Sequence, residues 1–311
     1  MIGIGSVGEG EQPSAREQEP SGHGALVKRY LGILKSSLLN ELYLELEARL
    51  LYIFYQRAND APVSPDVVRD IRGRRPDIVS YLAEQREKGN IAYTFTENIG
   101  GVLKEYDFRD VCEFSHTMIG RLRLDSLERC LDAVRIDRVP GDFIETGVWR
   151  GGACIFMRGY LEAYGMRGRR VWVADSFEGL PKPTHPADEG WDFSREKAPS
   201  FAISLDEVKD NFRRYDLLDD RVVFLEGWFK DSLPRAPVQE LALMRLDGDL
   251  YESTMDALTN LYHRLNPGGF VIVDDYSLEP CATAIKEFRA SRNIGDALVP
   301  IDAHSVYWRK G

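Results

Sequence analysis

Four aspartates stand directly after two short apolar runs, where they could bind a metal and accept a proton. Asp247 and Asp249 follow residues 241–246, and Asp274 and Asp275 follow the next such run. If both runs are parallel strands, their carboxyl ends meet at one edge of a sheet. Carboxylate oxygens are ligands that Mg²⁺ prefers, and a bound metal lowers the pKa of a hydroxyl group that it binds. A further carboxylate could then act as general base.

A glycine-containing turn, residues 145–152, could bind a cationic ligand. It reads Glu-Thr-Gly-Val-Trp-Arg-Gly-Gly between a strand-like and a helix-like run, so the backbone could approach a ligand near free N–H groups. The spacing matches neither GxGxxG nor GxxxxGK followed by Ser or Thr, which argues against a dinucleotide loop and a phosphate loop. Glu145, two residues before Gly147, suits the ammonium and sulfonium groups of S-adenosylmethionine.

A carboxylate after the next apolar run would suit a nucleoside. Residues 171–174 end at Asp175, which could accept both ribose hydroxyls of an adenosine, and Ser176 and Phe177 follow within reach of the nucleoside. The competing interpretation is a structural glycine turn with Asp175 as a helix cap, and with the later aspartates as helix caps after strands, Asp247 and Asp249 being Asx-turn residues. We favour ligand sites because the carboxylate pairs and the glycine turn occur together.

The elements that must position these groups are short strands alternating with helices from Gly141 onward. Such alternation predicts an α/β fold with a doubly wound, mostly parallel sheet. The predicted strands are residues 142–146, 171–174, 222–226, 241–246 and 270–273, with two short runs within 297–308. The predicted helices are residues 153–164, 205–215, 253–265 and 280–290. Residues 181–203 have no period and predict a long loop that acts as a lid.

The N-terminal part predicts helices outside this alternation. Residues 1–24 are rich in Gly, Ser, Glu and Pro and predict a disordered tail. Residues 25–57 carry apolar side chains at three- and four-residue steps, which predicts amphipathic helix ending before Pro62. Residues 66–97 predict helix and loop, and residues 121–134 predict a further helix.

The composition limits which partners the protein can bind and in which cellular compartment we expect it. The 311 residues carry a net charge of -10 with a pI near 5.2, which argues against a nucleic-acid binder. The chain has no apolar run of about 18 residues, so we expect no membrane partner. The four cysteines form no CxxC pair, and we expect reduced thiols in a cytoplasmic protein.

Several runs in the second half of the chain resemble the macrocin O-methyltransferase family. They are residues 141–152, 172–179, 227–232, 247–253 and 267–276, and the resemblance covers roughly residues 105–310. It implies a Rossmann-like class I methyltransferase fold. It also implies transfer of a methyl group from S-adenosylmethionine, which becomes S-adenosylhomocysteine, to a sugar hydroxyl of a glycosylated natural product. Macrolide and aminocoumarin antibiotics are such products.

The same resemblance implies roles for the site residues. Asp247, Asp274 and Asp275 would hold Mg²⁺, and Asp249 would be the general base, with Asp247 as the second catalytic residue. The residues that would bind the cofactor are Thr117, Met118, Glu145, Thr146, Gly147, Trp149, Asp175, Ser176, Phe177, Ser204, Gly227 and Trp228.

We therefore expect a methyltransferase domain over residues 136–311 and a helical cap over residues 25–135 that mediates formation of a homodimer or a higher homo-oligomer. One alternative is a catechol-type, metal-dependent O-methyltransferase acting on a small aromatic diol. A nicotinamide-dependent oxidoreductase is a second alternative, against which the missing GxGxxG argues. A third is a scaffold without activity, which would be expected to lack one of the carboxylates.

Overall fold

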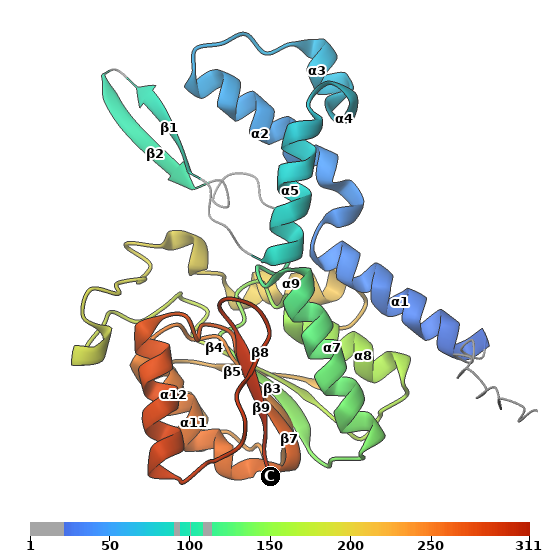
Figure 1. Cartoon of the computed structure of the whole chain (residues 1–311), viewed down its shortest axis with the longest axis vertical. Helices are drawn as coiled ribbons and strands as arrows, with labels where there is room; N and C mark the ends of the chain where they lie inside the picture. The colour runs from blue at the N-terminus through green and yellow to red at the C-terminus, as the bar shows by residue number, and fades with distance from the viewer. Residues whose placement is uncertain (1–21, 90–93, 100, 108–113) are drawn as a thin grey trace, which may run out of the picture.

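The C-terminal part of the chain folds around one seven-stranded sheet (Figure 1). The computed structural model describes residues 22–89, 94–99, 101–107 and 114–311. The strands are β3 Asp142–Thr146, β4 Val171–Asp175, β5 Val222–Glu226, β6 Leu241–Leu246, β7 Leu265–Val273, β8 Val299–Pro300 and β9 Val306–Arg309. Their order is β5-β4-β3-β6-β7-β9-β8, with β9 antiparallel to both of its neighbours and the other pairs parallel. The predicted α/β fold with a doubly wound, mostly parallel sheet is confirmed.

Helices cover both faces of the sheet because successive strand side chains point to opposite faces. On β3, Phe143 belongs to one hydrophobic core and Ile144 to the other. The first core includes helices α1 Gly22–Leu38, α7 Gly120–Ile136, α8 Gly152–Ala163 and α9 Leu205–Arg214. The second includes α11 Tyr251–Leu261 and α12 Glu279–Ser291. The strand order reverses between β3 and β6, the place where such sheets bind ligands.

The predicted elements of this domain are confirmed with shifts at their ends. The largest shift is in β7, which begins at Leu265 and not near residue 270. The run Asn266-Pro267-Gly268-Gly269 follows the predicted helix 253–265 and is typical of a helix stop. It instead continues into the strand, where an added Cβ at Gly269 would lie 2.8 Å from the Ala242 carbonyl oxygen of β6. A glycine is needed there because two strands approach each other closely.

The amphipathic segment near the N-terminus is not one helix. It divides into α1, a 3-10 turn at Glu41–Tyr43 and α2 Leu44–Ala58. The division falls at Asn40, whose φ of 55° is left-handed, a conformation that ends an α-helix. Residues 22–24 belong to α1, so the predicted tail is wrong for them, and residues 1–21 lie outside the described residues.

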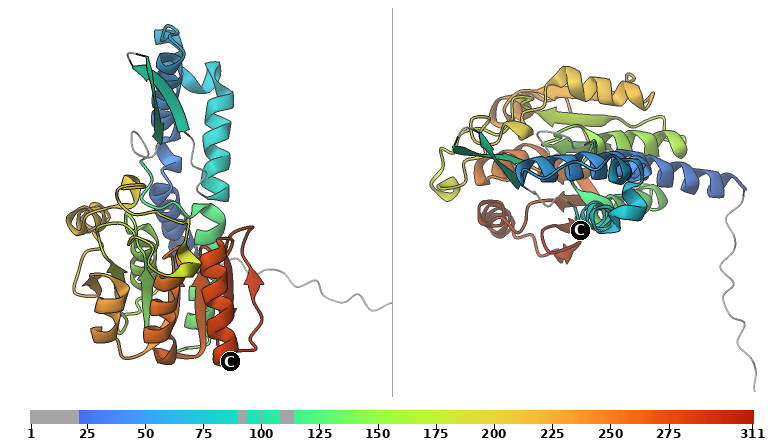
Figure 2. Two further views of the ribbon diagram at one scale, coloured as in Figure 1. Left: turned by 90° about the vertical axis from the view of Figure 1, so that its left-hand side faces the viewer. Right: turned by 90° about the horizontal axis from the view of Figure 1, so that it is seen from above.

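The segment after Asn40 forms a small cap with its own core (Figures 1 and 2). Leu44, Ala48 and Tyr52 of α2 pack with Ile71 and Leu82. The other cap helices are α3 Pro65–Arg69, α4 Ile71–Arg74 and α5 Pro76–Lys88. The predicted domain boundary near residue 135 stays a prediction, while α1 and α7, on its N-terminal side, contact α8 of the sheet domain.

A hairpin follows the cap helices and was missed by the sequence analysis. It pairs β1 Thr94–Ile99 with β2 Val102–Asp107 in antiparallel register, where residues 94–97 were expected to be helix or loop. The signal that could have revealed it is the Gly100-Gly101 pair between two runs of six residues.

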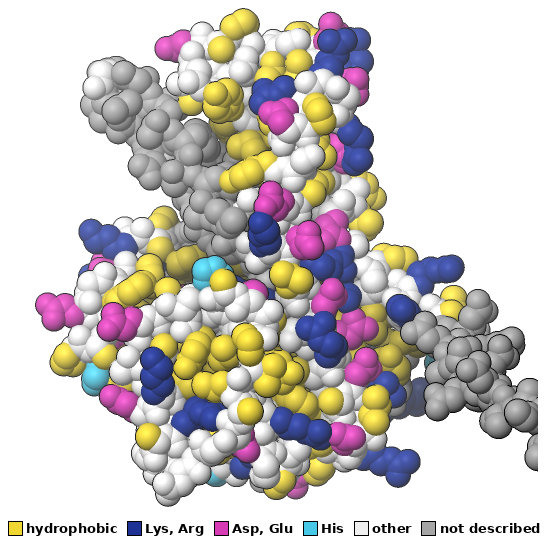
Figure 3. Space-filling model, in the orientation of Figure 1, with side chains coloured by type: hydrophobic (Ala, Val, Ile, Leu, Met, Phe, Trp, Pro, Cys, Tyr) yellow, Lys and Arg dark blue, Asp and Glu magenta, His cyan; other side chains and the backbone are white. Residues whose placement is uncertain are grey.

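Over the part of the chain that the structure describes, none of the helices combines the length and apolar character that a bilayer crossing requires. Positive and negative side chains are interspersed over the face of the molecule that Figure 3 shows.

A half-buried histidine links the ends of two helices. The backbone N–H of His116 donates to the Leu38 carbonyl at the end of α1, with N···O 2.7 Å. Its Nδ1 atom lies 2.7 Å from the Tyr215 hydroxyl, directly after α9. Burial, followed by the charges of Arg214 and Arg150, lowers the pKa of His116 from 6.5 to about 4. The neutral ring is therefore the form that the folded protein favours.

This lowered pKa predicts a loss of stability in acid. The unfolded chain binds more protons than the folded one between the two pKa values, so the free energy of unfolding falls as the pH decreases through this window. We expect wild type to lose about 2 kcal/mol more than His116→Asn between about pH 7.5 and about pH 5. Urea unfolding of both proteins at the two pH values measures the difference, and equal losses would contradict the assignment.

Candidate active site

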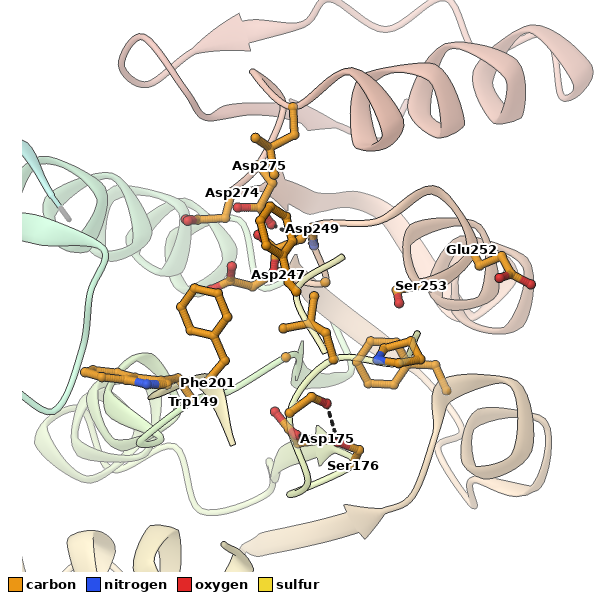
Figure 4. Close-up of a pocket in the computed structure, with 18 of the residues that line it drawn as sticks. Trp149, Asp175, Ser176, Phe201, Asp247, Asp249, Glu252, Ser253, Asp274 and Asp275 are labelled. Atoms are coloured by element: carbon orange, nitrogen blue, oxygen red, sulfur yellow. Dashed lines mark hydrogen bonds between the residues drawn. The ribbon is translucent and has the colours of Figure 1, made fainter. Parts of the chain in front are cut away.

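A cavity of about 580 Å³ opens at the carboxyl ends of β3, β4, β6 and β7 (Figure 4). It brings together most of the residues that the sequence analysis singled out. Those that line it are Met118, Gly147, Trp149, Asp175, Ser176, Trp228, Asp247, Asp249, Asp274 and Asp275. The cavity therefore joins the expected cofactor loop to the expected carboxylate site.

The glycine turn lies directly against the carboxylate loop. Gly147 has a φ of 84°, and an added Cβ would lie 1.7 Å from the Asp247 carbonyl oxygen, so only glycine fits. Farther along the turn, the Trp149 indole N–H donates to the Ser200 carbonyl of the loop 181–203, with N···O 2.9 Å. The turn thus contacts two other walls of the cavity.

Asp175 connects the glycine turn to the end of β4. Its Oδ2 accepts the Val148 N–H at 2.7 Å and its Oδ1 accepts the Phe177 N–H at 2.8 Å. The second contact is an Asx turn, where the competing interpretation expected a helix cap, and Asp175 also lines the cavity. Each carboxylate oxygen can accept a further hydrogen bond, so these contacts leave capacity for ribose hydroxyls.

The three predicted metal ligands lie together. One carboxylate oxygen from each of Asp247, Asp274 and Asp275 lies within 4.8 Å of the others. Asp249 lies beside them with a φ of 56°, and its N–H donates to Asp275 Oδ2 at 3.1 Å. Burial and the charge of Asp247 raise the pKa of the Asp249 carboxyl to about 8. Figure 4 shows all four side chains at one side of the cavity.

Two arginines that the sequence analysis missed hold this cluster. Arg245 of β6 is 1% exposed and donates to Asp247 Oδ2 at 2.6 Å, to Asp274 and to Glu145. Arg123 of α7 donates to the other oxygen of Asp274 and to Asp302, the latter at 2.7 Å. A charged residue inside the apolar run 241–246 was the available signal for Arg245.

Six of the expected cofactor residues are not in the lining of the cavity. Glu145 is buried behind it, where it accepts from Arg245 and, at 2.8 Å, from the Cys154 thiol, and burial raises its pKa to about 7. Thr117 and Thr146 are also buried. Ser204 caps α9 by accepting the Glu207 N–H. The remaining two are Phe177, which packs with Phe224, and Gly227, whose N–H donates to the Asp175 carbonyl.

The aromatic residues of the loop 181–203 form a row beside the cavity. The Phe193 ring contacts the rings of Trp191 and Phe201 edge to face, with centroids 6.1 Å and 6.3 Å apart respectively. Phe193 and Phe201 also line the cavity. These rings are therefore placed where an organic substrate would contact them.

The donor atoms in the cluster fit a hard cation. The three ligands within reach of one another are all carboxylates, and oxygen-only donor sets of this kind suit Mg²⁺ better than metals that prefer nitrogen or sulfur.

Comparison with known proteins extends the similarity beyond residues 105–310. The sequence model of the macrocin-O-methyltransferase (TylF) family matches residues 27–310, so it includes the helical N-terminal part. The mycinamicin III 3''-O-methyltransferase of Micromonospora griseorubida is 48% identical over 238 residues, which are 73% of this chain and 94% of that protein. The demethyldecarbamoylnovobiocin O-methyltransferase of Streptomyces niveus is 52% identical over 208 residues, 65% of this chain and 78% of that protein.

A solved structure supports the same relationship. The structure of the O-methyltransferase NovP superimposes with a TM-score of 0.70 at 39% identity and covers 91% of this chain and 99% of that chain. Together with the cavity, its glycine turn and its carboxylates, these matches identify the chain as an O-methyltransferase that belongs to the macrocin-O-methyltransferase family.

Proposed function

We propose that this chain is a cytoplasmic enzyme that transfers the methyl group of S-adenosylmethionine to a sugar hydroxyl of a glycosylated natural product. The observation that carries the proposal is the cavity lined by the glycine turn, by Asp249 and by three carboxylates that lie close enough together to hold a metal ion. By their names, two of the relatives above methylate mycinamicin III and demethyldecarbamoylnovobiocin. The described cysteines Cys130, Cys154 and Cys281 are free and buried, which suits a reducing compartment.

The residues divide between binding and proton transfer. Asp175 and the glycine turn bind and orient the methyl donor, and the aromatic row of the loop 181–203 keeps water from it. Asp247, Asp274 and Asp275 would hold Mg²⁺, which when bound lowers the pKa of a hydroxyl that it coordinates. Asp249 accepts the proton of the acceptor hydroxyl, the hydroxyl oxygen forms a bond to the methyl carbon, and the sulfonium becomes the thioether of S-adenosylhomocysteine.

Calorimetry and mass spectrometry test this proposal. We expect S-adenosylmethionine to bind and NAD not to bind, and we expect a glycosylated macrolide or aminocoumarin lacking one sugar methyl group to gain a single methyl. Binding of NAD without binding of S-adenosylmethionine would reject the enzyme class. Methylation of a simple aromatic diol, with no reaction of the glycosylated compounds, would instead favour the catechol-type enzyme.

We also propose that the protein is a homodimer formed through α1. Leu26, Tyr30 and Ile33 recur on one stripe of this helix and are 63%, 38% and 55% exposed. The first turns of α1 project beyond the sheet domain in Figure 1. We expect light scattering to give a dimer mass for wild type and a monomer mass for Leu26→Glu with Ile33→Glu. A monomeric wild type would contradict the proposal.

A further inference from the structure

The loop 181–203 contains a fully buried carboxylate that takes no part in the chemistry described above. Asp188, at the end of the 3-10 turn Pro186–Asp188, is 0% exposed. Its Oδ1 accepts the Tyr251 N–H at 2.6 Å and its Oδ2 accepts the Glu252 N–H at 3.2 Å. These are the first two residues of α11, and their N–H groups have no acceptor within the helix.

Asp188 therefore supplies, from another segment of the chain, the cap that α11 lacks. The residue at the cap position is Leu250, whose side chain cannot accept a hydrogen bond. A carboxylate at this end also interacts favourably with the helix dipole. The 3-10 turn contacts α12 as well as α11, which explains how the side chain is fully buried.

Two further contacts join the same segments. The Thr184 hydroxyl donates to the Glu252 carboxylate. The His185 ring stacks on the Tyr251 ring, with centroids 4.2 Å apart and planes inclined by 11°. Residues 184–188 are thus attached to Tyr251 and Glu252 by backbone, polar and aromatic contacts.

This attachment lies next to the general base and to one wall of the cavity. Asp249 precedes α11 by two residues and is held on its other side by the hydrogen bond from its N–H to Asp275. Thr184 from the loop and Glu252 from α11 both line the cavity. Figure 4 places Glu252 and Ser253 across the cavity from Trp149 of the glycine turn. The attached segment therefore lies on the opposite side of the cavity from Trp149.

We propose that Asp188 is a positioning residue that docks the loop 181–203 onto α11. The docking places Thr184 and Glu252, the wall of the cavity that would contact the methyl acceptor, beside Asp249. The proposal rests on the proposed methyl transfer for its kinetic consequence, but the docking itself is independent of activity. Loss of the carboxylate frees the N–H groups of Tyr251 and Glu252 and releases residues 184–188 from α11. The hydrogen bonds from Val148 to Asp175 and from Trp149 to Ser200, at the far end of the loop, do not involve Asp188 and are retained.

The variant Asp188→Asn tests this inference, with Asp192→Asn as the matched control. Asparagine keeps the shape but turns an amide group toward one of the two N–H donors. Asp192 lies exposed in the same loop and accepts only the local Ser194 N–H at 3.0 Å among its described hydrogen bonds. For Asp188→Asn we expect the KM for the glycosylated acceptor to rise about ten-fold or more, with unchanged affinity for S-adenosylhomocysteine. The control should match wild type.

Limited trypsin digestion measures the docking without any acceptor. Arg195 and Lys197 are exposed trypsin sites in this loop. We expect cleavage there to be about ten-fold faster in Asp188→Asn than in wild type or Asp192→Asn. Wild-type cleavage together with a wild-type KM would overturn the proposal. Equal losses of acceptor and cofactor binding, with a lowered Tm, would overturn it too, because they indicate a general folding role.

A second variant keeps the inference testable if Asp188→Asn does not fold. Thr184→Val combined with His185→Ala removes the hydroxyl contact and the ring stacking, together with the hydrogen bond from the Ala187 N–H to His185 Nδ1, and keeps the Asp188 carboxylate. Faster cleavage at Arg195 and Lys197 in this variant supports docking, and wild-type cleavage overturns it. If the wild type methylates no glycosylated acceptor, the proposed function fails, while the digestion still decides the docking.

Discussion

Replacement of Asp249 by asparagine is expected to reduce methyl transfer by about 10²- to 10⁴-fold, because positioned general bases contribute this much to rates. The substitution changes little else. Asparagine tolerates the φ of 56° at this position, and the backbone N–H that donates to Asp275 is retained. The variant should bind S-adenosylhomocysteine like wild type, and the lost activity then belongs to proton transfer.

Single-turnover kinetics with saturating acceptor, together with calorimetry, separate these effects. Asp210→Asn is the matched control, since Asp210 is an exposed residue of α9 that pairs with Arg213. The control should keep wild-type kinetics. Activity of Asp249→Asn within a few-fold of wild type would exclude Asp249 as the base and would direct attention to another carboxylate of the cluster.

Removal of divalent metal is expected to reduce turnover by at least about 100-fold, since a Lewis-acid metal supplies several kcal/mol to the transition state. The charge balance of the cluster supports this expectation. Asp247, Asp274 and Asp275 approach one another, and Asp249 lies beside Asp275. Among the described ion pairs, Arg245 pairs with Asp247 and Asp274, and Arg123 pairs with Asp274, so Asp249 and Asp275 have no paired cation there. A divalent cation would offset the remaining negative charge.

Dialysis against EDTA followed by addition of Mg²⁺ tests the metal, with EDTA already saturated with Mg²⁺ as the control. Direct titration with Mg²⁺ adds a measurement that does not depend on turnover. Asp275→Asn should weaken Mg²⁺ binding, because Asp275 accepts the Asp249 N–H and is not one of the aspartates paired with Arg245. Full activity after exhaustive chelation would remove the metal from the proposed mechanism.

Local sequence patterns predicted the bounds of three strands. The strands 142–146, 222–226 and 241–246 were predicted to the residue, because apolar runs there end at a glycine or an aspartate. Sequence patterns did not predict the end of a helix where a single backbone angle determines it. The left-handed Asn40 divides the first helix into two, although the apolar spacing continues across it.

Sequence by itself determined the chemistry that this protein carries: a glycine turn, Asp175, and four aspartates at two adjacent strand ends. These depend on residue type and on neighbours along the chain. Only the tertiary structure decided how each side chain is used. Glu145 was expected at the cofactor, but the register of β3 on β6 sets it opposite Arg245, where it neutralises buried charge behind the cavity. Arg123 and Asp188 likewise form hydrogen bonds with residues more than 60 positions away in the sequence, Asp274 and Tyr251 respectively. No local sequence pattern can reveal such partners.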